Sequence, residues 1–115
     1  MDRAIQTLPR LLTQQDCISS VKALAVRLSK KTNLTLQQVW LFGSYAQNKQ
    51  EDFSDIDVAI VADEFESVGF IDTQLIADAL IHFPLVEAHT YNTDDFVQQL
   101  HPFAIHIQKT GIRIL

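Results

Sequence analysis

The chain has 115 residues, a length that fits one domain built around a single hydrophobic core. Hydrophobic residues make up 47% and charged residues 20% of it, which is close to an average folded chain and excludes an intrinsically disordered one. Nine Lys and Arg against fourteen Asp and Glu give a net charge of −5, with no run of basic residues, so we expect no direct binding to nucleic acid.

No apolar stretch is long enough to cross a membrane, and the N-terminus lacks the charged and apolar regions of a signal peptide. The single cysteine, Cys17, has no second cysteine to pair with and no histidine at metal-ligand spacing, which is typical of a reducing compartment. We therefore expect a cytoplasmic protein without membrane contact, in which Cys17 packs in the core.

In the first half of the chain, apolar spacing predicts one long helix and one buried strand. Apolar residues recur at steps of three and four over residues 16–31, so we expect an amphipathic helix there with Asp16 as its N-cap. The sequence also allows an earlier short helix around residues 4–13. The run 39–42 is apolar at every position, as in a strand buried on both faces, and Gly43 ends it.

The second half alternates strands with helices. Residues 53–61 read as a strand whose first half carries acidic residues on one face. The spacing then predicts a helix over 70–82, which Pro84 ends, and a third strand over 85–91. The remaining predicted elements are a helix from an N-cap at Thr93 to about Leu100, a helix from Pro102 that Gly111 stops, and a short strand over 112–115.

Two short motifs carry the chemistry. Asp55 and Asp57 project from one face of a strand with Cα atoms roughly 6 to 7 Å apart, so their carboxylates can converge on divalent cations. Gly43 and Ser44 form a turn after a buried strand, where glycine lets backbone amides and a hydroxyl approach a phosphate closely. Each motif alone is more often an ordinary turn or a solvated strand edge, but together, with ten residues between them, they favour neighbouring metal and phosphate sites.

Gly43-Ser44-Tyr45-Ala46, the stretch 54–58 and the C-terminal Gly111-Ile112 resemble the minimal nucleotidyltransferase (MNT) family of the DNA polymerase β-like superfamily. The resemblance runs from about residue 40 to the end, and implies an α+β fold: a mixed β-sheet flanked by helices, like the polymerase β palm, in one nucleotidyltransferase domain over residues 1–115. It implies transfer of a nucleoside monophosphate to an acceptor hydroxyl, with ATP as substrate and two Mg²⁺ ions as cofactors. By this resemblance, Asp55 and Asp57 are the first two metal-binding acids, and Gly43 and Ser44 hold the phosphates.

By the same resemblance, a third acid comes from a following strand. Glu87 is the only carboxylate within the third predicted strand, and an unpaired charge there is costly to bury, so we expect it to be a metal ligand or base. His89 lies on the same face, and we interpret it as a structural histidine because Mg²⁺ prefers oxygen ligands. Family members often have a basic residue and a glycine where this chain has Gln47 and Asn48, which predicts a weaker phosphate grip; Lys49 is more simply a solvated lysine.

The chain has little room for a substrate-binding domain, so we expect the acceptor to come from a macromolecular partner. Stand-alone members of the family resemble the antitoxin half of HEPN/MNT toxin-antitoxin pairs, which implies a hetero-oligomer with a HEPN ribonuclease toxin and a toxin tyrosine that receives AMP. Two alternatives stay open: a binding-only antitoxin that occludes its toxin, and a nucleotidyltransferase acting on a small molecule.

Several apolar residues are either core or interface. Tyr45 and Tyr91 are candidates for contacts near the site, although buried aromatics are the simpler interpretation. The other candidates are Phe96, Phe103, Ile105, Ile107 and the tail 112–115.

Overall fold

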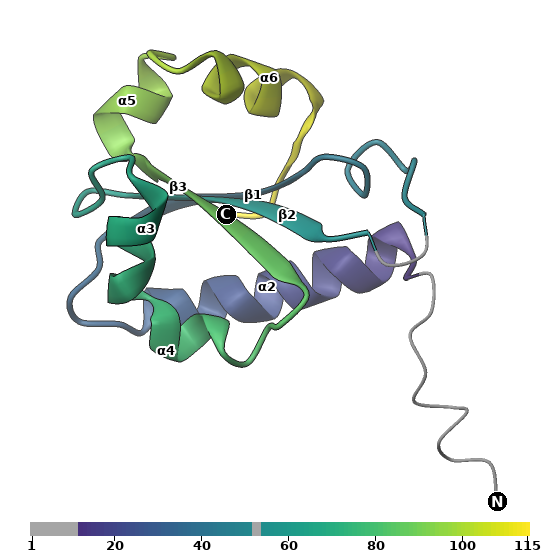
Figure 1. The fold of residues 1–115 in the computed structure, drawn as a ribbon, viewed down its shortest axis with the longest axis horizontal. Helices are drawn as coiled ribbons and strands as arrows, with labels where there is room; N and C mark the ends of the chain where they lie inside the picture. Colours follow the sequence, from purple (N-terminus) through teal and green to yellow (C-terminus); the bar gives the residue numbers. More distant parts are fainter. Residues whose placement is uncertain (1–11, 52–53) are drawn as a thin grey trace, which may run out of the picture.

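The computed structural model describes residues 12–51 and 54–115, which form a four-stranded sheet in the order β3-β2-β1-β4 (Figure 1). The strands are β1 (Leu36–Phe42), β2 (Ile56–Ala62), β3 (Val86–Asn92) and β4 (Ile112–Arg113). β1 pairs antiparallel with β2 and β4, whereas β2 and β3 are parallel. The expected mixed sheet is confirmed, although β1 begins three residues earlier than predicted and β4 is shorter.

Helices cover both faces of this sheet, which confirms the predicted α+β arrangement. α2 (Gln14–Ser29), α3 (Gly69–Asp72) and α4 (Ala77–Leu80) lie on one face. α5 (Thr93–Val97) and α6 (Pro102–Thr110) lie on the other, as Figure 1 shows. Because both faces are covered, β2 is apolar at every position except Asp57, and β1 is apolar from Val39 to Phe42.

Alternate residues of β2 serve the two layers. Val58 and Ile60 belong to the core shared with α2, whereas Ala59 and Val61 pack in the core shared with α5 and α6. Successive side chains of a strand point to opposite faces, so Asp57 lies on the same face as Ala59. The acid of the motif is therefore on the α5–α6 side of the sheet.

The long helix begins two residues before the predicted start. The hydroxyl of Thr13 accepts a hydrogen bond from the N–H of Asp16, and the N–H of Thr13 donates to the Asp16 carboxylate, both at 3.0 Å. The prediction that Asp16 is the N-cap is thus wrong: Thr13 caps α2, and Asp16 completes a capping box. The short helix predicted around residues 4–13 falls largely outside the described residues.

Cys17 is fully buried on the core face of α2, as predicted. Burial raises the pKa of its thiol to about 11, with a smaller contribution from the charge of Asp16. The thiol is therefore protonated at neutral pH and acts as a packing group.

The single helix predicted over 70–82 is wrong. The chain forms α3, a 3₁₀ turn over Thr73–Leu75 and α4, because Ile76 leaves the helical region with φ −126° and ψ 10°. Ile76 and Ala79 are nevertheless buried, as their spacing predicts. The spacing of apolar residues indicates which side chains face the core. A 3₁₀ turn can bury the same side chains without the continuous hydrogen bonding of one α-helix.

Asp72 at the end of α3 is a buried carboxylate that sequence reasoning missed. Its oxygens accept hydrogen bonds from the N–H groups of Glu66 and Val68 and from the hydroxyl of Thr90, each at 2.9 Å. These bonds fasten the chain after β2 to β3. They explain how a charged group is accommodated at 1% exposure.

The C-terminal elements follow the prediction with small shifts. Asn92 is the N-cap of α5, since its side chain accepts from the N–H groups of the second and third helical residues; Thr93 was the predicted cap, and this prediction is wrong. α5 ends at Val97, earlier than expected. α6 begins at Pro102 and stops at Gly111 as predicted. Within the described ranges, no helix is long and apolar enough to cross a membrane.

Candidate metal and nucleotide site

The turn that ends β1 lies against Asp57. Gly43 has φ +75°, which L side chains rarely adopt, and a Cβ at this position would collide with the Asp57 carboxylate. Phe42, just before the turn, is the register partner of Asp57 across β1 and β2. The structure therefore brings the glycine of one motif beside the second acid of the other.

The predicted phosphate-binding turn is held in place from α2. Gln14 donates side-chain hydrogen bonds to the carbonyls of Tyr45 and Ala46, both at 3.0 Å. The N–H of Lys49 closes the turn on the carbonyl of Ser44 at 2.8 Å. Because these bonds use carbonyl oxygens, they fix the loop without occupying the Ser44 hydroxyl.

The parallel pairing of β2 and β3 brings a second acid and a histidine to Asp57. Asp57 is directly opposite Glu87 in the register, and Ala59 is opposite His89. One ligand atom from each of Asp57, Glu87 and His89 lies within 4.8 Å of the others. His89 Nε2 is 3.4 Å from Asp57 Oδ1 and 3.8 Å from Glu87 Oε1. Two of the three predicted acids thus meet, and the third member of the group is a histidine.

Asp55 stands apart from this group. It precedes β2, is exposed, and is not among the residues whose ligand atoms cluster. Its charge still reaches the site, since it is one cause of the perturbed ionisation of Asp57. Asp55 as a ligand stays a prediction.

Asp57 is a carboxyl group whose surroundings disfavour its charge. Burial is the largest cause and raises the pKa of Asp57 above its ordinary value, and repulsion by Asp55 adds to this. The proximity of His89 acts in the opposite direction and lowers the pKa of Asp57, but burial outweighs it. A cation at this point would relieve the cost of ionising Asp57.

His89 is held by packing while its ring nitrogen lacks a partner. The imidazole contacts Phe42 edge-on, with ring centroids 5.0 Å apart and planes at 70°. Nε2 is buried, yet its approach to Asp57 lacks the geometry of a hydrogen bond, and it has no other partner. Within the described residues, only one other buried side-chain atom, Gln50 Oε1, is in this state.

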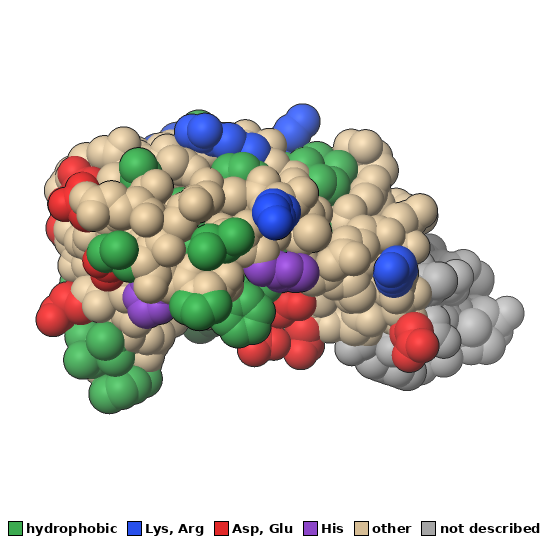
Figure 2. All heavy atoms as spheres, turned by 90° about the horizontal axis from the view of Figure 1, so that it is seen from above, with side chains coloured by type: hydrophobic (Ala, Val, Ile, Leu, Met, Phe, Trp, Pro, Cys, Tyr) green, Lys and Arg blue, Asp and Glu red, His purple; other side chains and the backbone are tan. Residues whose placement is uncertain are grey.

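These observations fit a divalent cation. Two carboxylates and an imidazole supply three donor atoms within reach of one ion. A bound ion would give the buried Nε2 a partner and would favour the charged form of Asp57, which burial disfavours. Figure 2 shows acidic side chains gathered beside a histidine on the face that α5 and α6 cover, with hydrophobic side chains close by.

The remaining residues considered in the sequence lie outside the group of Asp57, Glu87 and His89. Tyr45 and Tyr91 are 2% and 7% exposed, so the simpler interpretation as buried aromatics is confirmed. Burial raises the pKa of the Tyr91 hydroxyl. Gln47, Asn48 and Lys49 are exposed on the turn after β1, which leaves the predicted weakness of the phosphate grip as it stands.

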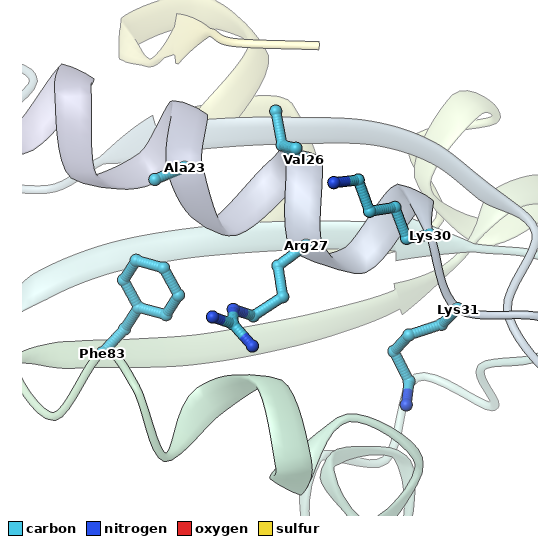
Figure 3. A pocket seen from close by; sticks show the side chains of 6 residues that line it. All are labelled: Ala23, Val26, Arg27, Lys30, Lys31 and Phe83. Atoms are coloured by element: carbon cyan, nitrogen blue, oxygen red, sulfur yellow. The ribbon is translucent and has the colours of Figure 1, made fainter.

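A separate hollow of about 610 Å³ lies along α2, on the opposite side of the sheet from the acids (Figure 3). It is lined by Ala23, Val26, Arg27, Lys30, Lys31 and Phe83. Figure 3 shows Arg27 reaching across it towards Phe83, and Lys31 pairs with Asp78 at 2.8 Å. The C-terminal end of α2 and the residues after it thus gather Arg27, Lys30 and Lys31 on the face of the sheet opposite Asp57.

A family model described as polymerase beta, nucleotidyltransferase matches residues 24–115. Comparison with curated proteins finds no match. Among solved structures, a presumed nucleotidyltransferase from Sulfolobus solfataricus aligns with a TM-score of 0.64 and 18% identity, over 87% of this chain and 80% of that one.

Two further similar structures are toxin-antitoxin complexes. One, solved with AMP-PNP, aligns with a TM-score of 0.55 and 19% identity, over 82% of this chain and 72% of that one. The other is a mutant of the pair MntA–HpeT, with a TM-score of 0.51 and 18% identity, over 85% of this chain and 72% of that one. At these identities the likeness is one of fold.

Proposed function

Because the chain belongs to the polymerase β nucleotidyltransferase family, we propose that it transfers AMP from ATP to a tyrosine hydroxyl of a HEPN ribonuclease toxin and so acts as an antitoxin. The observation that carries this proposal is the meeting of Asp57 and Glu87 beside the Gly43 turn. An acidic pair next to a turn that admits phosphate is the arrangement that nucleotidyl transfer requires. The similar toxin-antitoxin folds support the choice of partner.

In this proposal the turn after β1 binds the triphosphate. The missing side chain at Gly43 lets the turn lie directly against the Asp57 carboxylate, and Ser44 offers its hydroxyl to a phosphate held beside that acid. Asp55, Asp57 and Glu87 would hold two divalent ions, Mg²⁺ by the resemblance, which when bound neutralise phosphate charge and acidify the acceptor hydroxyl. The acceptor oxygen bonds to the α-phosphorus, the bond from that phosphorus to the β-phosphate oxygen breaks, and pyrophosphate leaves.

Glu87 is the acid best placed to receive the acceptor's proton. Its side chain is 55% exposed, against 25% for Asp57, so an incoming hydroxyl can reach it. A solvent-accessible carboxylate close to the acceptor hydroxyl can take its proton as the hydroxyl oxygen attacks the phosphorus. The more buried Asp57 then serves as a fixed ligand.

The surface on the α5–α6 side of the sheet supports a protein acceptor. Leu100 and Phe103 are 63% and 61% exposed, and Val97 and Ile105 are also exposed, whereas Phe96 and Ile107 are core residues. Exposed apolar side chains on the face that carries the acids suit the docking of a protein whose tyrosine enters the site. We place this reaction in the cytoplasm, where ATP is available, and in a hetero-oligomer with the toxin.

The two alternatives predict different behaviour. A binding-only antitoxin would neutralise the toxin without nucleotide, and the acids would be dispensable. An enzyme for a small molecule would modify a free acceptor with no partner protein present. The geometry of Asp57 and Glu87 favours an enzyme, and the exposed apolar surface favours a protein acceptor.

The test is incubation of the chain with labelled ATP, a divalent cation and a candidate HEPN protein, followed by intact mass measurement of both. We expect the partner to gain one or more AMP units and its ribonuclease activity to fall. Asp57→Asn should abolish the mass gain. Asp94→Asn, which changes an exposed acid on α5, is the matched control and should leave the mass gain intact.

Two results would contradict the proposal. Neutralisation by Asp57→Asn at the level of the unaltered chain would indicate occlusion instead of transfer. Transfer to a free small acceptor, with none to the protein, would indicate the small-molecule enzyme.

A further inference from the structure

We propose that His89 Nε2 is a nitrogen ligand to a divalent ion shared with Asp57 and Glu87, so that this half of the site prefers Mn²⁺, Co²⁺ or Zn²⁺ over Mg²⁺. The inference deepens the proposed function and rests on it, because the ion would be one of the two that serve the transfer.

Backbone pairing sets the position of the three side chains. The parallel register puts Glu87 opposite Asp57, and His89 follows Glu87 by two residues on the same face of β3. All three ligand atoms lie within 4.8 Å of one another. The contact with Phe42 limits how far the imidazole can turn from the acids.

The state of Nε2 argues for a ligand. A histidine nitrogen taken out of water normally finds a hydrogen-bond partner, and Nε2 has none, although Asp57 Oδ1 is only 3.4 Å away. A purely structural histidine would use that carboxylate as an acceptor with good geometry. An imidazole whose buried Nε2 lies close to two carboxylates without a hydrogen bond to either is instead arranged to bind a cation together with them.

The mixture of donors determines which ion is preferred. Mg²⁺ selects oxygen ligands and rarely accepts imidazole, whereas imidazole suits the first-row transition ions and Zn²⁺. A site with two carboxylates and one imidazole should therefore discriminate against Mg²⁺. An ion held by Asp55, Asp57 and the triphosphate, with oxygen ligands alone, keeps the preference for Mg²⁺.

The sequence interpretation of His89 as structural assumed that the ion is Mg²⁺. In the structure, the donor set of Asp57, Glu87 and His89 determines which ion fits. His82, exposed before β3 and outside the cluster, is a matched control.

The experiment measures the binding of Co²⁺ alone and of Mg²⁺ alone to the metal-free chain by calorimetry, and nitrogen coupling to bound Mn²⁺ by pulsed EPR. We expect Co²⁺ to bind about 100-fold more tightly than Mg²⁺, and ¹⁴N coupling to appear. His89→Asn should weaken Co²⁺ binding by at least about 10-fold, change Mg²⁺ binding little and remove the coupling, whereas His82→Asn should change none of these.

Equal affinity for Co²⁺ and Mg²⁺, or bound Mn²⁺ without nitrogen coupling, would overturn the inference. The coupling is measured on the unaltered chain, so the result does not depend on whether His89→Asn folds. AMP transfer measured on the same preparation separates the two proposals. Transfer without nitrogen ligation contradicts only the role of His89, and nitrogen ligation without transfer to any partner contradicts only the proposed function.

Discussion

The ionisation of Asp57 predicts that divalent cations stabilise the fold. Burial raises the pKa of this carboxyl, so the folded chain holds its proton more tightly than the unfolded chain does. Stability therefore falls as the pH rises through the ordinary pKa and then the raised one, and at neutral pH the whole cost of the charge is present. A cation bound at Asp57 binds only the folded site and offsets that cost.

The size of the effect follows from mass action. An ion at about 100 times its dissociation constant adds about 2.7 kcal/mol to the free energy of unfolding. Unfolding entropy of about 2.1 cal/mol/K per residue gives about 0.24 kcal/mol/K for 115 residues. Saturating Mn²⁺ should therefore raise the midpoint of thermal unfolding by about 11 °C, measured by circular dichroism or calorimetry.

Asp57→Asn tests the reasoning in the metal-free state as well. At pH 7 the variant should unfold at a higher temperature than the unaltered chain, since it carries no buried charge, and Mn²⁺ should raise its midpoint little. As the pH is lowered through the raised pKa of Asp57, the difference between the two metal-free proteins should shrink, because the folded chain takes up the proton of Asp57. A metal-free variant that is less stable at pH 7, or one that keeps the full rise with Mn²⁺, would refute the argument.

Three further changes test the fold around the site, each by urea unfolding. Gly43→Ala should lower the free energy of unfolding by at least about 2 kcal/mol, because φ is positive and the new Cβ meets the Asp57 carboxylate. The control Gly69→Ala, whose Cβ would have no atom within 4 Å, should change it by no more than about 0.5 kcal/mol. Equal effects of the two substitutions would contradict the close approach of Gly43 to Asp57. Asp72→Ala should cost about 2 to 4 kcal/mol because it strands three donors, and a loss below about 1 kcal/mol would mean that water replaces them. Thr13→Ala should cost about 1 kcal/mol through the lost cap of α2, and no loss would argue against the capping box.

The sequence predicted the central parts of β1 and β2 because these parts are apolar on both faces. It misplaced their starts, predicted at residues 39 and 53 and observed at Leu36 and Ile56. A strand that is buried on both faces is a short apolar run, which can be recognised without knowing its neighbouring strands. Gly43 marks the end of the first strand, and Pro84 marks the boundary before the third. The helix ends were predicted less well. Thr13 lies three residues before the predicted cap Asp16, and Asn92 lies one residue before the predicted cap Thr93. Only the hydrogen bonds distinguish the cap from the first turn.

The site could be predicted only as far as local spacing reaches. Spacing along the chain predicts that Asp55 and Asp57 share one face of a strand and that Glu87 and His89 share one face of a later strand. The register that sets Asp57 opposite Glu87 depends on how the two strands pair, which local spacing does not determine. The buried state of Nε2 has no sequence signal at all. The sequence also gave no sign of the role of Asp72, since an acidic residue within a predicted helix is usually exposed to solvent.

The placement of charge across the sheet bears on how an acidic chain would bind the polyanionic substrate of the proposed function. Asp57 and Glu87 lie on the α5–α6 side, whereas Arg27 and Lys30 line a hollow along α2. A sheet with packed helices puts these groups about a Debye length or more apart, so the bases do little to offset the field at the acids. A triphosphate that approaches the Gly43 turn therefore meets carboxylates first, and only bound divalent ions reverse the sign of that field. Under the proposed function, nucleotide binding would therefore depend on the prior binding of cations at Asp57, which would link the stability of the fold to the chemistry of the site.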